Sequence, residues 1–100
     1  MNRRRKKASP LNDQVNFWIE RKSETSNILS ISVTEIKKNG VIVITPSDLF
    51  PEFTSITLAY AFCMGPADMA YPNHDVYLGS TDQKIMSKII RLLNKGDVSK

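Results

Sequence analysis

An Asn-Gly pair between two apolar segments is the feature that most constrains how this chain can fold. Residues 28–36 alternate between apolar and polar side chains, a period of two that predicts a strand with one buried face. Asn39-Gly40 follows and favours a tight turn, because both residue types tolerate positive φ. Residues 41–45 then return as an apolar, largely β-branched run. The sequence therefore predicts an antiparallel hairpin of residues 28–36 and 41–45.

A third apolar segment, residues 54–64, alternates large and small side chains. The large residues share one face of an extended chain: Ile56, Leu58, Tyr60, Phe62 and Met64. This alternation predicts a third strand over 54–64. A buried helix is the alternative, because Leu, Ala and Met favour helices.

Residues 81–94 carry the clearest helical pattern. Ser80 and Gln83 have the spacing of a capping box, and Gly96 is expected to end the helix as its C-cap. Apolar residues recur on one side of this helix at helical spacing: Ile85, Ile89, Leu92 and Leu93. We expect this helix to cover the sheet, and a short edge strand over residues 76–78.

Residues 13–22 have two interpretations. Asn12 or Asp13 suits the N-cap of a short helix, but Val15, Phe17 and Ile19 also alternate as in a strand. Trp18, in the same segment, is expected to anchor it on the sheet, and base stacking is the competing role.

Together these patterns predict an α+β fold, mainly β, with a small antiparallel sheet covered by the C-terminal helix. Residues 11–96 would form one domain, between a disordered basic arm (1–10) and a frayed tail (97–100). Hydrophobic residues make up 41% of the 100 residues and charged ones 24%, as in soluble globular proteins. No apolar run approaches the ~20 residues that span a membrane, and no apolar segment follows the basic start as in a secretory signal. Cys63 is the single cysteine, which excludes an internal disulfide.

The positive charge is concentrated near the start of the chain. The chain has 14 Lys and Arg against 10 Asp and Glu, and residues 3–7 are all basic. The formal net charge of +4 therefore belongs to this arm, because the rest of the chain is close to neutral. Such an arm binds phosphates, serves as a nuclear-import signal or aids solubility. The candidate nucleic-acid-binding residues lie in the arm, the hairpin turn and the C-terminal helix: Arg3, Arg4, Arg5, Lys6, Lys7, Lys37, Lys38, Lys84, Lys88 and Arg91.

Residues 65–80 contain the only histidine, with carboxylates nearby. Asp68, His74 and Asp75 are chemically sufficient for a weak divalent-metal or acid/base site. Turns are also rich in Asp for backbone hydrogen bonding, and we expect this role here, with no metal and no cofactor. No phosphate-binding glycine loop, HExxH motif or Ser/His/Asp grouping is found, so we do not expect an enzyme.

The order of segments in residues 27–64 resembles jelly-roll coat proteins of small plant RNA viruses, especially of satellite viruses. It runs from an alternating strand through Asn39-Gly40 and an apolar strand to Leu49-Phe50 and then to residues 53–58, Phe-Thr-Ser-Ile-Thr-Leu. The resemblance implies a β-sandwich that self-assembles, here in reduced form because the chain is short of eight strands. It also implies that residues 3–7 neutralise packaged RNA inside a particle. The C-terminal helix is similar instead to those of small RNA-phage coat proteins.

These observations predict a structural, virion-associated protein that binds RNA more readily than DNA through its arm and self-associates, without a membrane partner. Its expected location is the virion or the host cytoplasm. The alternative is a small regulatory interaction module whose arm directs it to the nucleus.

Overall fold

The computed structural model of the chain describes residues 12–98. Four strands and two α-helices follow the order β1 (Gln14–Arg21), β2 (Leu29–Ile36), β3 (Ile42–Thr45), α1 (Ile56–Met64), β4 (Asp75–Gly79) and α2 (Gln83–Val98). Two short 3-10 turns, η1 (Ser47–Leu49) and η2 (Asp68–Ala70), lie before α1 and β4. Strands and α-helices contain equal numbers of residues, so the predicted α+β class is confirmed while neither type dominates. The arm, residues 1–10, lies outside the described residues.

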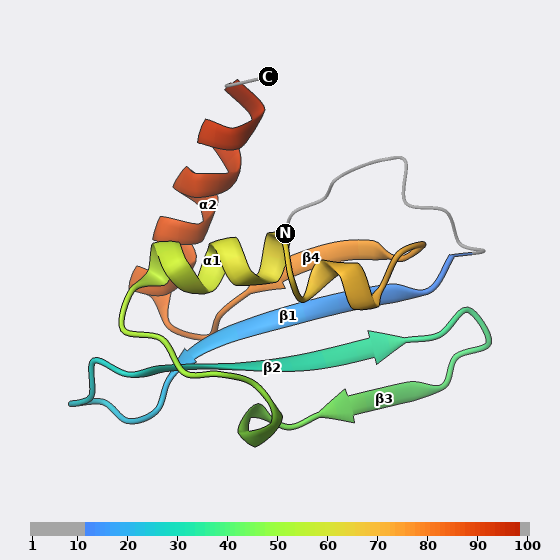
Figure 1. Cartoon of the computed structure of the whole chain (residues 1–100), viewed down its shortest axis with the longest axis horizontal. Helices are drawn as coiled ribbons and strands as arrows, with labels where there is room; N and C mark the ends of the chain where they lie inside the picture. Colours follow the sequence, from blue (N-terminus) through green and yellow to red (C-terminus); the bar gives the residue numbers. More distant parts are fainter. Residues whose placement is uncertain (1–11, 99–100) are drawn as a thin grey trace.

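The strands form one sheet in the order β3-β2-β1-β4 (Figure 1). The predicted hairpin is confirmed as β2 and β3, which pair in antiparallel register, and the predicted edge strand as β4. The sheet is mixed, however, and not wholly antiparallel, because β4 runs parallel to β1. Among the described residues there is this single sheet, so the jelly-roll architecture of two packed sheets is not what they form.

Residues 14–21 form a central strand, which decides between the two interpretations of that segment. β1 pairs with β2 along its whole length and with β4 along part of it. Val15, Phe17 and Ile19 are fully buried on one face and lie beside the buried residues of β2. Hydrogen bonds on both edges therefore override the helix-capping signal at Asn12 and Asp13.

The prediction of a strand over residues 54–64 is wrong, because α1 occupies this segment. Ser55 caps the helix, its hydroxyl accepting a hydrogen bond from the Leu58 N–H at 3.3 Å. Ala59 and Cys63, four residues apart, are fully buried. Two small residues are thus the most deeply buried of the helix, while the large Ile56, Tyr60 and Phe62 are partly buried against the core. The large–small alternation that suggested a strand does not match the helical period of 3.6 residues.

Helix α1, not α2, lies across the face of the sheet (Figure 1). α2 begins beside the start of α1, buries Ile85 and Ile89, and then projects away from the sheet. The C-terminal helix is confirmed, but its start differs from the predicted capping box. The Asp82 carboxylate, and not Ser80, accepts the N–H groups of Lys84 and Ile85. The helix also continues through Gly96 to Val98, so Gly96 is not its C-cap and the predicted frayed tail is partly helical.

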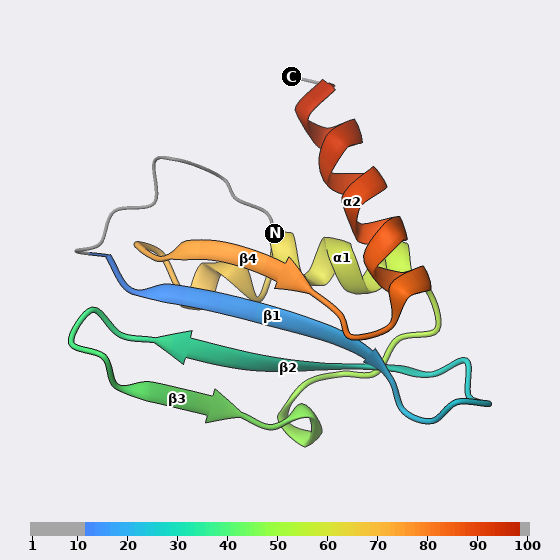
Figure 2. The same cartoon turned by 180° about the vertical axis from the view of Figure 1, so that it is seen from behind.

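The core lies between α1 and one face of the sheet. It contains the buried side chains of β1 and β2 together with Ala59, Cys63, Leu78, Ile85 and Ile89. The opposite face is uncovered by any helix of the described residues, as Figure 2 shows. None of the described helices is long and apolar enough to cross a membrane.

Candidate functional site

Charged side chains gather where the tip of the β2–β3 hairpin, the start of β1 and the loop before β4 meet. We call this the hairpin end and define it by Asn12, Asp13, Glu35, Lys37, Lys38 and His74. Sheet register brings these residues together, since Gln14 lies opposite both Ile36 and Asp75. The Asp75 N–H also donates to the Asp13 carbonyl at 3.0 Å, which fixes the loop before β4 against the start of β1.

The hairpin turn presents two lysines beside the point where the chain enters the domain. The Lys38 N–H donates to Asp13 Oδ1 at 2.7 Å, so the turn is tied directly to the start of β1. The Lys38 side chain is exposed, and Lys37 Nζ lies 3.7 Å from Glu35 Oε2. Four residues separate Lys7 from Asn12 in the sequence, so the chain between these two residues spans at most ~18 Å. Half of the basic residues of the chain are therefore tethered to one end of the domain.

Three of the predicted nucleic-acid-binding residues lie elsewhere. Lys84, Lys88 and Arg91 lie on α2, with Lys84 and Arg91 exposed, on the side away from buried Ile85 and Ile89. α2 starts at the opposite end of the sheet from the hairpin tip (Figure 1). The structure thus separates the predicted residues into two groups. Residues 3–7, the first five of them, lie outside the described part of the chain.

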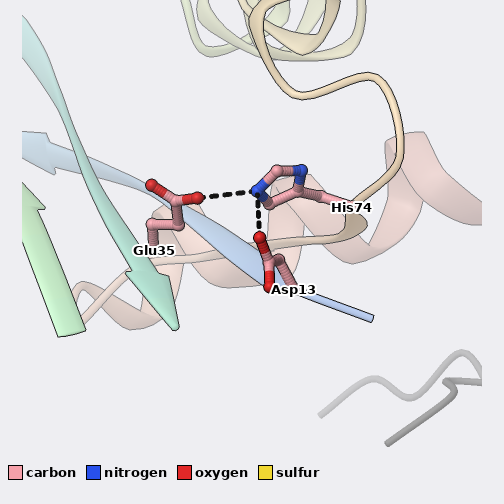
Figure 3. A group of neighbouring side chains, drawn as sticks. All are labelled: Asp13, Glu35 and His74. Carbon is pink, nitrogen blue, oxygen red and sulfur yellow. Dashed lines mark hydrogen bonds and ion pairs between the residues drawn. The ribbon is translucent and has the colours of Figure 1, made fainter. Parts of the chain in front are cut away.

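A histidine and two carboxylates form the most closely packed polar cluster of the hairpin end (Figure 3). His74 Nε2 lies 2.8 Å from Glu35 Oε2 and 3.7 Å from Asp13 Oδ2. The side chain of His74 is 14% exposed, that of Glu35 15% and that of Asp13 25%. An ionised carboxylate can only accept, so the Nε2–H donates to Glu35. The three residues come from three separate segments of the chain.

Aromatic contacts hold the imidazole in place. The Tyr71 ring meets the His74 ring edge to face at 5.1 Å, and Tyr71 in turn meets the fully buried Phe17 at 5.8 Å. His74 Nδ1 and Asp75 Oδ2 are buried without a hydrogen-bond partner among the described residues. The imidazole is therefore oriented from the core, with Nε2 directed toward the two carboxylates.

Sequence reasoning singled out His74 but paired it with the wrong acids. Asp68 lies in η2 and is not part of the cluster, and Asp75 contributes no atom to it. Asp13 and Glu35 were missed because both are remote from His74 in sequence. Glu35 did carry a signal, since it continues the buried register of Leu29, Ile31 and Val33. An acid on that face of a strand needs a partner.

Two further residues, Trp18 and Cys63, have side chains that can bind ligands or react, but both are packed within the fold. Trp18 lies on the open face, where its Nε1–H donates to Thr34 Oγ1 at 3.2 Å. A Cβ on Gly79 would lie 3.2 Å from Trp18 Cζ3, so the indole packs against the β4 backbone there. Burial raises the pKa of the Cys63 thiol to about 12, so this group is not a thiolate nucleophile at neutral pH.

Comparison with protein-family models, with curated proteins and with solved structures finds no significant match to this chain.

Proposed function

We propose that this protein is a non-enzymatic structural protein that binds nucleic acid through residues 3–7 together with Lys37 and Lys38. The observation that supports it most is the hydrogen bond from the Lys38 N–H to Asp13 Oδ1, which fixes the hairpin tip beside the entry of the basic segment. Charges that share one end of a domain can follow one stretch of phosphates. Binding of this kind depends on salt and hardly on sequence, because each neutralised phosphate releases counterions.

We also propose that the protein self-associates through β3. This strand ends the sheet order, so its outer edge has no strand partner among the described residues. Its sequence, Ile-Val-Ile-Thr, carries no charge, and Ile42 and Ile44 are 60% and 69% exposed. An exposed, apolar edge strand is a template for pairing with another strand. Many copies acting together would also compensate for the weak affinity of five to seven phosphate contacts. The preference for RNA over DNA rests on the resemblance of residues 27–64 to viral coat proteins.

The test is the affinity of the full chain for single-stranded RNA as a function of salt, measured by fluorescence anisotropy. Replacing residues 3–7 by glutamine should reduce the slope of log affinity against log salt by up to ~3.5, at ~0.7 for each charge. Lys37→Gln with Lys38→Gln should reduce it by up to ~1.4. Single-stranded DNA of the same sequence, measured in parallel, tests the preference for RNA.

The matched control replaces the basic residues of α2, with Lys84→Gln, Lys88→Gln and Arg91→Gln in one variant. It removes more charge than the turn variant does, but at the other end of the sheet, and should leave the slope unchanged. A loss of slope in the α2 variant alone would place the interface on that helix. An unchanged slope after replacement of residues 3–7 would refute the nucleic-acid function and leave nuclear import as the role of the segment.

A further inference from the structure

We propose that Asp13, Glu35 and His74 form a binding site for one divalent transition-metal ion, with Zn²⁺ and Mn²⁺ as its closest chemical fits. This proposal does not rest on nucleic-acid binding: His74 and Glu35 have no part in the proposed function, and Asp13 serves it only through Oδ1, which accepts the Lys38 N–H. One imidazole nitrogen and two carboxylate oxygens suit ions that accept both donor types.

The distances among the three donor atoms agree with a shared ion. His74 Nε2, one oxygen of Glu35 and one of Asp13 all lie within 4.8 Å of one another. Bonds of ~2.1 Å place neighbouring ligands of one ion ~3.0–3.5 Å apart, depending on whether the geometry is octahedral or tetrahedral. The distances from Nε2, 2.8 Å to Glu35 and 3.7 Å to Asp13, bracket this range. Small side-chain rotations would therefore suffice to close the site.

Each of the three ligand side chains is positioned by the pairing of the strands or by a contact with a residue outside the cluster. Val15, two residues after Asp13, lies directly opposite Glu35 in the β1–β2 ladder, which sets the spacing of the two acids. Asp13 Oδ1 accepts the Lys38 N–H, and this leaves Oδ2 for the ion. Tyr71 holds the imidazole ring. Contacts of this kind orient the side chains that coordinate an ion and preorganise a metal site.

Charge and access also favour a cation here. Asp13 and Glu35 bring two carboxylates close together, and Lys37 Nζ lies 3.7 Å from Glu35 Oε2. A divalent ion would neutralise both carboxylates and replace the Nε2–H contact with a bond to Nε2. A surface hollow lined by Asn12, Asp13, Lys38, Pro72, Asn73 and His74 opens beside the cluster. The hollow gives water molecules room to complete the coordination. The ion would therefore have three protein ligands, and exchangeable water molecules would fill its other positions.

The first experiment measures Zn²⁺ binding by isothermal titration calorimetry, on the full chain without a histidine tag. We expect one ion per chain and a rise in the melting temperature with Zn²⁺ concentration, because the ion binds only the folded state. His74→Gln and Glu35→Gln should each weaken binding at least tenfold. Asp68→Asn is the matched control, since Asp68 is close to His74 in sequence but outside the cluster, and should bind like the unchanged protein.

The second experiment needs no substitution and so does not depend on whether the variants fold. Substoichiometric Mn²⁺ should broaden the amide resonances of residues 12–14, 34–36 and 73–75 in a ¹⁵N spectrum before any others. Broadening centred elsewhere, an unbroadened spectrum, or undiminished Zn²⁺ binding by a folded His74→Gln variant would overturn the proposal.

Discussion

At the scale of single residues, Asp82 joins two parts of the molecule that are distant in sequence. Its Oδ1 accepts the Lys84 and Ile85 N–H groups at the start of α2, and its Oδ2 accepts Nε and Nη2 of Arg21 at 3.0 and 2.6 Å. The hydrogen bond from Arg21 and that from the Ile85 N–H hold the pKa of this carboxyl below its usual value. A single side chain thus caps α2 and connects it to the end of β1.

The first prediction concerns the pH dependence of this contact. Because the pKa of Asp82 is lower in the folded state, the stabilisation is present above the unfolded value, near 3.8, and is lost as pH falls through the folded pKa. Asp82→Asn keeps an acceptor but removes the charge. We expect a lower melting temperature for the variant at pH 6, and a difference that becomes smaller as pH falls below 3.8.

Thermal unfolding followed by circular dichroism between pH 3 and 7 measures this difference. Asp48→Asn, at an exposed position in η1 without such partners in the described contacts, is the control and should show little pH-dependent difference. A difference for Asp82→Asn that stays constant over the whole range would contradict the role of its charge.

At the scale of elements, the turn of the hairpin shows how backbone conformation selects a residue. Gly40 has a φ of +92°, which L side chains rarely adopt. Its N–H donates to the Lys37 carbonyl at 2.8 Å, and the Lys37 N–H donates to the Val41 carbonyl at 2.8 Å. Asn39 Oδ1 accepts the Val41 N–H at 3.1 Å and completes the turn. The Asn-Gly signal is thus explained by the positive φ of the glycine and the side-chain acceptor of the asparagine.

We therefore expect Gly40→Ala to destabilise the protein by ~1–2 kcal/mol. No atom lies within 4 Å of the added Cβ, so the cost would come from the backbone alone. Gly40→Asn should cost less, because asparagine visits the left-handed region more readily than alanine does. Urea unfolding measures both variants, and equal stability of Gly40→Ala and the unchanged protein would show that the turn relaxes to another conformation.

At the scale of the whole molecule, the sheet is covered on one side only. α1 shields the buried face, while the open face and the β3 edge remain exposed in the described part of the chain (Figure 2). The exposed apolar residues concentrate near β3, in a run from Ile36 across the turn to Ile44. A small domain that leaves such an edge exposed can gain stability by pairing with a second copy, and the isologous contact of two identical antiparallel edges closes on itself.

The whole-molecule prediction is that the protein self-associates and that Ile44→Lys weakens the association at least tenfold. A lysine on an edge strand opposes pairing, because its charge would be buried in the contact. Met69→Lys is the matched control, since Met69 is 79% exposed but lies in η2, away from β3. Analytical ultracentrifugation over a range of concentrations measures the effect. A monomer at every concentration, or equal association of the two variants, would exclude β3 as the interface.

The sequence by itself determined the elements whose signals are local. The β2–β3 hairpin, the β4 edge strand and helix α2 were predicted because turn residues and periodicity act within a few positions along the chain. Even in these elements, the contacts that involve residues distant in sequence differed from the prediction. Asp82, which also bonds to Arg21, caps α2 in place of the predicted Ser80.

Only the tertiary structure decided the elements whose local signals were balanced and the residues that meet across the sheet. Residues 14–21 became a strand because β2 and β4 bind both of its edges, and residues 56–64 a helix because small Ala59 and Cys63 allow close packing on the sheet. The Asp13–Glu35–His74 cluster depends on the register of three strands. No pattern confined to one segment encodes it, because its members come together only when the whole sheet has formed.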